Sequence, residues 1–121
     1  MKIEHFAISV ADPVAFAAWY GEHFQLRVIR HIPEPNQTHF LSDSEGGVIE
    51  IYHQPAYLPD YAAQHPLQLH LAFVSTDPDA DRGRLVTAGA TFVSEQKHPD
   101  GTHLMMLRDP WGFSIQLCKR V

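Results

Sequence analysis

Apolar and polar residues alternate over residues 2–10, and this pattern predicts a strand. Asp12 and Pro13 follow the strand. This pair is typical of a helix start, because aspartate caps free backbone N–H groups and proline fits the first helical turn. Apolar side chains then recur at helical spacing as far as Phe24. Prolines and glycines separate three further predicted strands, at residues 25–32, 38–41 and 48–53.

The same pattern occurs a second time, 65 residues further along the chain. The segment HFAISVADP, which begins at His5, matches HLAFVSTDP, which begins at His70. The segment DSEGGVIEI from Asp43 likewise matches DPWGFSIQL from Asp109. The second copy therefore has a predicted helix at residues 77–89 and predicted strands at residues 68–75, 91–96, 103–107 and 113–118. We interpret the chain as a duplicated βαβββ module.

The two modules are expected to form one domain over residues 1–121. They comprise residues 1–53 and 67–121, joined by a proline-containing linker at residues 54–66. The predicted class is α+β: two βαβββ modules form a curved mixed sheet, with helices outside and a concave face within. A chain of this length is sufficient for one such core.

One polar residue with metal-binding atoms lies next to apolar residues of the opposite strand face in the first and last strand of each module. These residues are His5, Glu50, His70 and Gln116. Their apolar neighbours are expected to pack against the helices, so the four side chains are predicted to point into the concave face. Two imidazoles, a carboxylate and an amide oxygen suit a divalent first-row metal ion. The alternative is a polar cavity that binds no metal.

Charge and composition exclude several classes of partner. A net charge of −5 argues against nucleic acid or an anionic membrane as the main partner. No apolar run is long enough to span a membrane, and the N-terminal residues do not resemble a signal peptide. Cys118 is the single cysteine and has no internal disulfide partner, so we expect a reducing, cytoplasmic location. The acidic segment at residues 77–81 is interpreted as a complement to the helix dipole.

With these features, the chain resembles the vicinal oxygen chelate superfamily over essentially its whole length. That superfamily includes glyoxalase I, methylmalonyl-CoA epimerase, fosfomycin and bleomycin resistance proteins, and extradiol dioxygenases. The resemblance rests on the duplicated module, the HFAISVADP and HLAFVSTDP openings, and the DPWGFSIQL ending. It implies a homodimer and a metal site formed by His5, Glu50, His70 and Gln116. Most enzymatic members have glutamate where this chain has Gln116, and this departure disfavours the ligand set of an extradiol dioxygenase.

The resemblance leads us to expect a metal-dependent enzyme of the glyoxalase-like lyase or isomerase type. It would hold a Zn, Ni, Mn, Co or Fe ion, act on a small substrate with neighbouring oxygen atoms, and use Glu50 as the catalytic base. The alternatives are a non-catalytic small-molecule binding protein of the bleomycin-resistance type and an Fe(II) extradiol-type dioxygenase.

A glutathione-linked substrate is not expected. Bacterial glyoxalase I has an arginine and an asparagine, which help to hold glutathione, at the positions of Ser9 and Gln54. No basic cluster replaces them, and burying a ligand carboxylate without a positive partner is costly. Four arginines fall on an early strand or an outer helix rather than on the concave face: Arg27, Arg30, Arg82 and Arg84.

Overall fold

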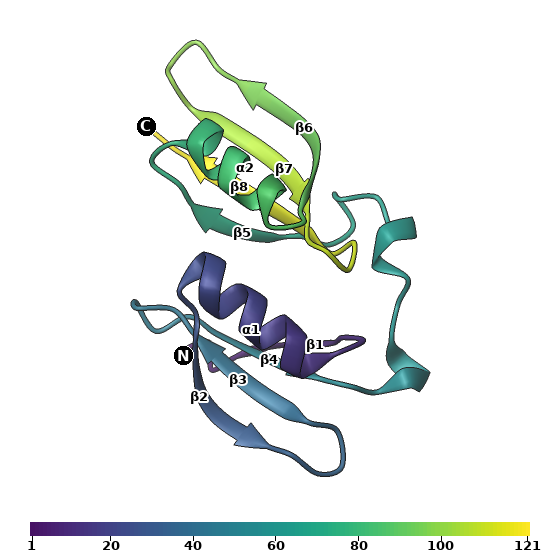
Figure 1. Ribbon diagram of the computed structural model, residues 1–121. Helices are drawn as coiled ribbons and strands as arrows, with labels where there is room; N and C mark the ends of the chain where they lie inside the picture. The colour runs from purple at the N-terminus through teal and green to yellow at the C-terminus, as the bar shows by residue number, and fades with distance from the viewer. The chain divides into compact units, whose positions relative to one another are not determined.

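The chain folds into two copies of one βαβββ unit, as the internal repeat predicts (Figure 1). The computed structural model describes residues 1–121 and divides them into two units, Met1–Pro59 and Asp60–Val121. Each unit contains a four-stranded mixed sheet and one α-helix. The predicted α+β class with two repeated modules is therefore confirmed.

The first unit places its strands in the order β1-β4-β3-β2, with β1 parallel to β4 and the other neighbours antiparallel. Its elements are β1 (Phe6–Ser9), α1 (Pro13–Phe24), β2 (Arg27–Ile32), β3 (Thr38–Ser42) and β4 (Val48–Tyr52). Helix α1 begins where predicted, because the Ala15 N–H donates a hydrogen bond of 3.0 Å to the Asp12 carboxylate and Pro13 occupies the first turn. The helix lies across one face of the sheet and buries Phe16 and Tyr20 (Figure 1).

The second unit repeats this arrangement in the order β5-β8-β7-β6, with β5 parallel to β8. Its elements are β5 (Leu71–Val74), α2 (Pro78–Thr87), β6 (Thr91–Lys97), β7 (His103–Arg108) and β8 (Ser114–Lys119). Asp77 caps α2 as Asp12 caps α1, by accepting a hydrogen bond of 3.1 Å from the Ala80 N–H. The edge strands β2 and β6 each shift register near their first residues. The two units therefore share even their irregularities.

Three segments differ from the sequence-based expectation. The predicted strands at residues 2–10 and 68–75 begin only at Phe6 and Leu71, so both candidate histidines lie immediately before a strand. Two short 3₁₀ turns, Pro55–Tyr57 and Tyr61–Ala63, occur within residues 54–66. No helix has the length and apolar character needed to cross a lipid bilayer.

The turn before β8 is held by one buried carboxylate. Asp109 is 3% exposed, and its Oδ1 accepts hydrogen bonds of 2.9 Å from the N–H groups of Trp111 and Phe113. Gly112 in this turn has φ +85°, and a Cβ atom at this position would lie only 2.9 Å from the Ala62 Cα. The turn therefore fixes the start of β8 against the segment that precedes β5.

Candidate functional site

Glu50 lies on the face of the first sheet that points away from α1. It pairs with Ala7 on β1 and with Phe40 on β3, while its neighbour Ile51 is fully buried on the helix side. His5 precedes Ala7 by two residues and so lies on the Glu50 face. The Nε2 atom of His5 is 2.9 Å from the Oε2 atom of Glu50. The structure thus brings together the two candidate ligands of the first unit.

The surroundings of His5 favour its protonated form. Its Nδ1 atom is hydrogen-bonded to the Glu4 carboxylate, and this bond is the main reason why the pKa of His5 is raised above its usual value. The negative charges of Glu4 and Glu50 act in the same direction, while desolvation opposes them. The ring also meets Phe40 edge-on, at 5.8 Å between centroids. Two carboxylates and an aromatic side chain therefore hold the imidazole in place.

A cavity of about 350 Å³ adjoins Glu50. It is lined by Asn36, Thr38, Glu50, Tyr52, Gln54 and Tyr57. Amide, hydroxyl and phenol groups predominate among these residues, so the space beside the carboxylate can receive a small polar molecule.

The second unit repeats the register of the first unit at Gln116. Gln116 pairs with Ala72 as Glu50 pairs with Ala7, and His70 precedes Ala72 by two residues. His70 and Gln116 therefore lie on the same face of their sheet. The Nδ1–H of His70 donates to the Pro66 carbonyl at 2.8 Å, which orients the ring and leaves Nε2 as the nitrogen for a ligand.

The environment of Gln116 is less polar than that of Glu50. Its cavity of about 500 Å³ is lined by the apolar residues Pro66, Leu67, Val93, Leu104 and Met106, together with the polar residues His65, Ser94, Glu95 and Gln96. The Oε1 atom of Gln116 accepts a hydrogen bond of 3.2 Å from the Cys118 thiol. Cys118 is buried, and this burial raises the pKa of its thiol above the usual value. Cys118 is therefore a protonated hydrogen-bond donor rather than a nucleophile.

Two other histidines near strand ends do not join the candidate ligands. His53 donates from Nδ1 to the Val10 carbonyl at 2.9 Å. His103 pairs with Lys119 at one end of β7, whereas Met106 is the β7 residue opposite Gln116. Strand alternation therefore places His103 on the helix side of the sheet.

Two arginines lie on the faces that carry the candidate ligands, a feature that the sequence analysis missed. Arg30 pairs with Phe40 and so lies, contrary to expectation, on the Glu50 face, with its guanidinium 5.8 Å from the Phe40 centroid. The register of β2 shifts between Val28 and Arg30, so the face on which Arg30 lies does not follow from simple alternation along the strand. Arg108 pairs with Ser114 two residues before Gln116 and so shares its face.

The guanidinium of Arg108 is hydrogen-bonded within the second unit. Its guanidinium donates to the carbonyls of Tyr61, Gly112 and Gln64 at 2.9, 2.9 and 2.7 Å. It therefore fixes the segment before β5, rather than remaining available to a ligand.

Comparison with known proteins agrees with the duplicated fold. The model of the Glyoxalase/Bleomycin resistance protein/Dioxygenase superfamily matches residues 2–117. The chain belongs to this superfamily. No curated protein sequence matches the chain.

Solved structures with similar folds come from several branches of the superfamily. A glyoxalase family protein from Bacillus cereus has a TM-score of 0.80 and 18% identity, over 98% of this chain and 93% of the other. TnmS3, an antibiotic binding protein from Streptomyces sp. CB03234, has a TM-score of 0.75 and 19% identity, over 100% and 97% of the two chains. A lactoylglutathione lyase from Agrobacterium tumefaciens has a TM-score of 0.68 and 19% identity, over 97% and 92%. At these identities the similarity establishes the superfamily fold.

Proposed function

We propose that this superfamily member is a metal-dependent enzyme of the glyoxalase-like lyase or isomerase type. Its substrate is a small molecule with oxygen atoms on neighbouring carbons. The observation that carries the proposal is the pair formed by His5 Nε2 and Glu50 Oε2, 2.9 Å apart and beside a polar cavity. His70 and Gln116 occupy the same register in the second unit.

The four candidate ligands form a suitable set of donors for a divalent first-row cation. His5 and Glu50 are already within the distance that separates two ligands of one ion, and the Nδ1 bond of His70 directs its other nitrogen outward. Imidazole nitrogen and carboxylate oxygen suit Zn, Ni, Mn, Co and Fe. We propose that His5, Glu50, His70 and Gln116 hold one such ion, within one chain or between two chains of a dimer.

The proposed reaction transfers a proton between neighbouring carbons of the substrate. A bound divalent cation would polarise a carbonyl oxygen and stabilise the negative charge that develops there. Glu50 would remove the proton from the adjacent carbon and return it to the former carbonyl carbon, while the hydroxyl proton passes to the former carbonyl oxygen. Glu50 is assigned this role because it is the single carboxylate among the four residues. In the metal-free protein, His5 orients the carboxylate through the 2.9 Å contact. Glu50 must loosen from the cation in order to act as the base.

Two contacts support a substrate that is not linked to glutathione. The Ser9 hydroxyl and the Gln54 backbone bond to each other, at 3.0 Å in each direction, and Ser9 is buried. They occupy the positions of the arginine and asparagine in bacterial glyoxalase I, and they offer no positive charge to a carboxylate. Arg30 is a further cation on the Glu50 face, and it lies over Phe40.

Metal content and proton exchange test this proposal. Protein expressed with added metals should contain about one divalent ion per chain, and His70→Ala should lose it while retaining its circular dichroism spectrum. Incubated in D₂O with small hydroxyketones and hydroxyacids, the loaded protein should exchange a substrate C–H, as followed by NMR. Glu50→Gln should abolish this exchange, whereas Glu45→Gln, at an exposed turn position, should retain it.

Two results would contradict the proposal. The first is metal content that is unchanged in His70→Ala. The second is robust formation of S-lactoylglutathione from the methylglyoxal–glutathione hemithioacetal, lost in Glu50→Gln, because it would identify a glutathione-linked glyoxalase.

A non-catalytic binding protein is the second candidate, and the apolar cavity beside Gln116 favours it. Its hydrophobic residues, with a few polar groups among them, suit an organic ligand that is bound without reaction. Saturable binding of such ligands by metal-free protein, with no C–H exchange by the loaded protein, would support this candidate over the enzyme.

A further inference from the structure

Three side chains with metal-binding atoms meet in the second unit, at residues other than the candidate ligands His70 and Gln116. Asp79 lies in the first turn of α2, Glu95 on β6 and His103 on β7. Their ligand atoms lie within 4.8 Å of one another, and His103 Nε2 is 2.7 Å from Glu95 Oε2. We call these three residues the outer cluster.

The outer cluster lies on the opposite face of the sheet from Gln116. Glu95 pairs with Met105, which is fully buried, whereas Gln116 pairs with Met106. Because neighbouring residues of a strand point to opposite faces, Glu95 and Gln116 project on different sides. The carboxylate of Glu95 therefore projects away from Gln116, although Glu95 also borders the Gln116 cavity at the edge strand β6.

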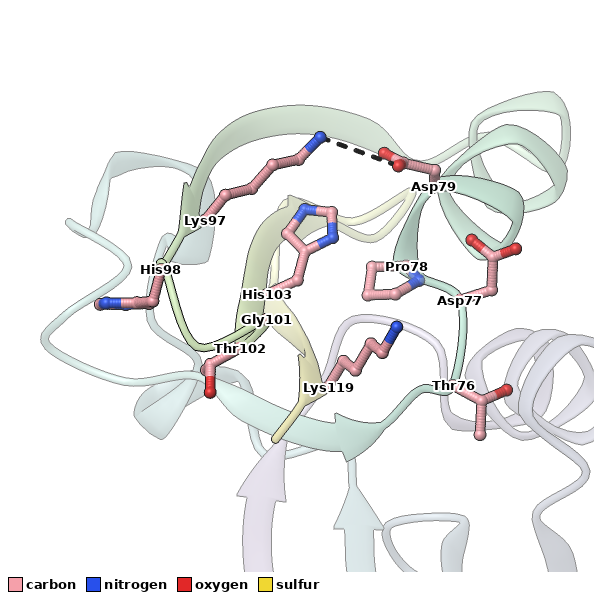
Figure 2. Close-up of a pocket in the computed structure, with 10 residues that line it drawn as sticks. All are labelled: Thr76, Asp77, Pro78, Asp79, Lys97, His98, Gly101, Thr102, His103 and Lys119. Atoms are coloured by element: carbon pink, nitrogen blue, oxygen red, sulfur yellow. Dashed lines mark ion pairs between the residues drawn. The ribbon is translucent and has the colours of Figure 1, made fainter. Parts of the chain in front are cut away.

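The cluster combines a fixed ligand with two adjustable ligands. The His103 side chain is 10% exposed, whereas those of Glu95 and Asp79 are 32% and 64% exposed. Asp79 and His103 line a cavity of about 440 Å³, in which the His103 ring points toward the Lys97–Asp79 pair (Figure 2). The imidazole is thus held by the sheet, while the carboxylates can move and the site is open to ions.

The repeated module does not require this combination of residues. In the first unit, the positions equivalent to Asp79, Glu95 and His103 are occupied by Val14, His31 and Gln37, as the strand registers and the two helix caps show. A carboxylate in the first turn of a helix is explained by the helix dipole, and a His–Glu pair by its own hydrogen bond. Neither reason accounts for the convergence of all three from three different elements.

We propose that Asp79, Glu95 and His103 form a second metal site for a borderline divalent cation of the Zn²⁺ type. One imidazole nitrogen and two carboxylate oxygens suit Zn²⁺ or Co²⁺, whereas Ca²⁺ and Mg²⁺ prefer oxygen ligands alone. Bond lengths of about 2.0–2.2 Å require the three ligand atoms to approach by roughly an ångström, which rotation of the exposed carboxylates supplies.

Lys97 competes with a cation at this site. Its Nζ atom is 3.9 Å from Asp79 Oδ2, and its side chain is 61% exposed. Such an exposed pair is weak, so the lysine can turn away when a divalent ion arrives. Arg82 and Lys119 add further positive charge near the cluster. Because positive charge repels a cation, removal of Lys97 should strengthen metal binding.

Calorimetric titration with Zn²⁺ tests the outer cluster in full-length protein that carries His5→Ala and Glu50→Gln. These two changes disable the site proposed for catalysis, so failure of one proposal can be told from failure of the other. In this background, Asp79→Asn and Glu95→Gln should each weaken Zn²⁺ binding roughly tenfold or more. Glu22→Gln, an exposed carboxylate on α1, is the matched control and should leave the affinity unchanged. Lys97→Ala should bind Zn²⁺ more tightly than the background protein.

The ring resonances of His103 provide an independent readout, because Zn²⁺ at Nε2 shifts its ¹⁵N signal. A shift of this signal that Asp79→Asn weakens supports the proposal. The proposal is overturned if the background protein binds no Zn²⁺, if Asp79→Asn and Glu95→Gln bind it as tightly as Glu22→Gln, or if Lys97→Ala fails to tighten binding.

Discussion

Asp109 shows how one residue can hold a turn. Its buried carboxylate satisfies two backbone N–H groups, and Asp109→Ala leaves both without this acceptor. We predict a loss of about 2–3 kcal/mol in the free energy of unfolding, measured by urea denaturation. Asp43→Ala is the matched control from the first module: Asp43 accepts similar bonds from Glu45 and Gly47 but is exposed, so its loss should be smaller. Equal losses would contradict the role assigned to burial.

Asp100 makes stability depend on pH at the turn between β6 and β7. The Thr102 N–H donates to its carboxylate at 2.8 Å, and this bond is the main cause of a lowered pKa at Asp100. A lowered folded-state pKa stabilises the protein above the unfolded value of about 3.9, and this contribution is lost as the pH falls through the folded-state pKa. The urea concentration at the midpoint of unfolding should therefore be higher for the wild-type protein than for Asp100→Asn at pH 6. This difference should shrink toward pH 3. A constant difference would argue against this linkage.

Single residues differ in how far the sequence predicts their partners. Glu50 could be placed on its face because it lies between two isoleucines in a regular strand, and His5 could be placed with it by alternation with the apolar residues that follow it. The two side chains do meet. The outer cluster escaped prediction because Asp79, Glu95 and His103 come from three elements. Its geometry depends on how α2 lies over the sheet, which alternation within one strand does not determine.

At the scale of elements, the turns before β4 and β8 contain equivalent glycines whose substitution costs can be compared. Gly46 and Gly112 have φ values of +92° and +85°, but a Cβ at Gly112 would lie 2.6 Å from the Ala62 Cβ, whereas a Cβ at Gly46 meets nothing within 4 Å. Gly46→Ala should cost about 1 kcal/mol, from backbone strain alone. Gly112→Ala should cost roughly 2–4 kcal/mol, because crowding is added to that strain. Urea denaturation of both variants measures the difference, and equal costs would exclude a tight contact with Ala62.

Helix starts were predicted well, and strand boundaries less well, for physical reasons. Asp12 and Asp77 cap their helices through local hydrogen bonds, which are determined by neighbouring residues. A strand requires a partner as well as alternation, and residues 2–5 alternate without joining the ladder of β1. The register shift in β2 likewise depends on its pairing with β3, so the face of Arg30 could not be obtained from its own segment.

At the scale of the whole molecule, we predict a homodimer. The superfamily resemblance implies one, and both β2 and β6 are edge strands whose residues are all exposed. Exposed edges of this kind are usually covered, and Val28 and Ile29 on β2 add apolar surface. Sedimentation velocity at micromolar concentration should give twice the chain mass of 13.7 kDa. A monomer at that concentration would confine the proposed catalytic metal site to a single chain.

Chemical labelling of the buried Cys118 thiol can measure slow local opening of the second unit. The Cys118 side chain is buried on the face of β8 that carries Gln116, so a thiol reagent reaches it only when the side chains that cover it move away. The rate of native-state labelling therefore measures the free energy of this opening without any engineered probe. Added Zn²⁺ should slow the labelling if an ion at the outer cluster holds α2, β6 and β7 together. The labelling rate would then detect the bound ion even if that ion has no effect on catalysis.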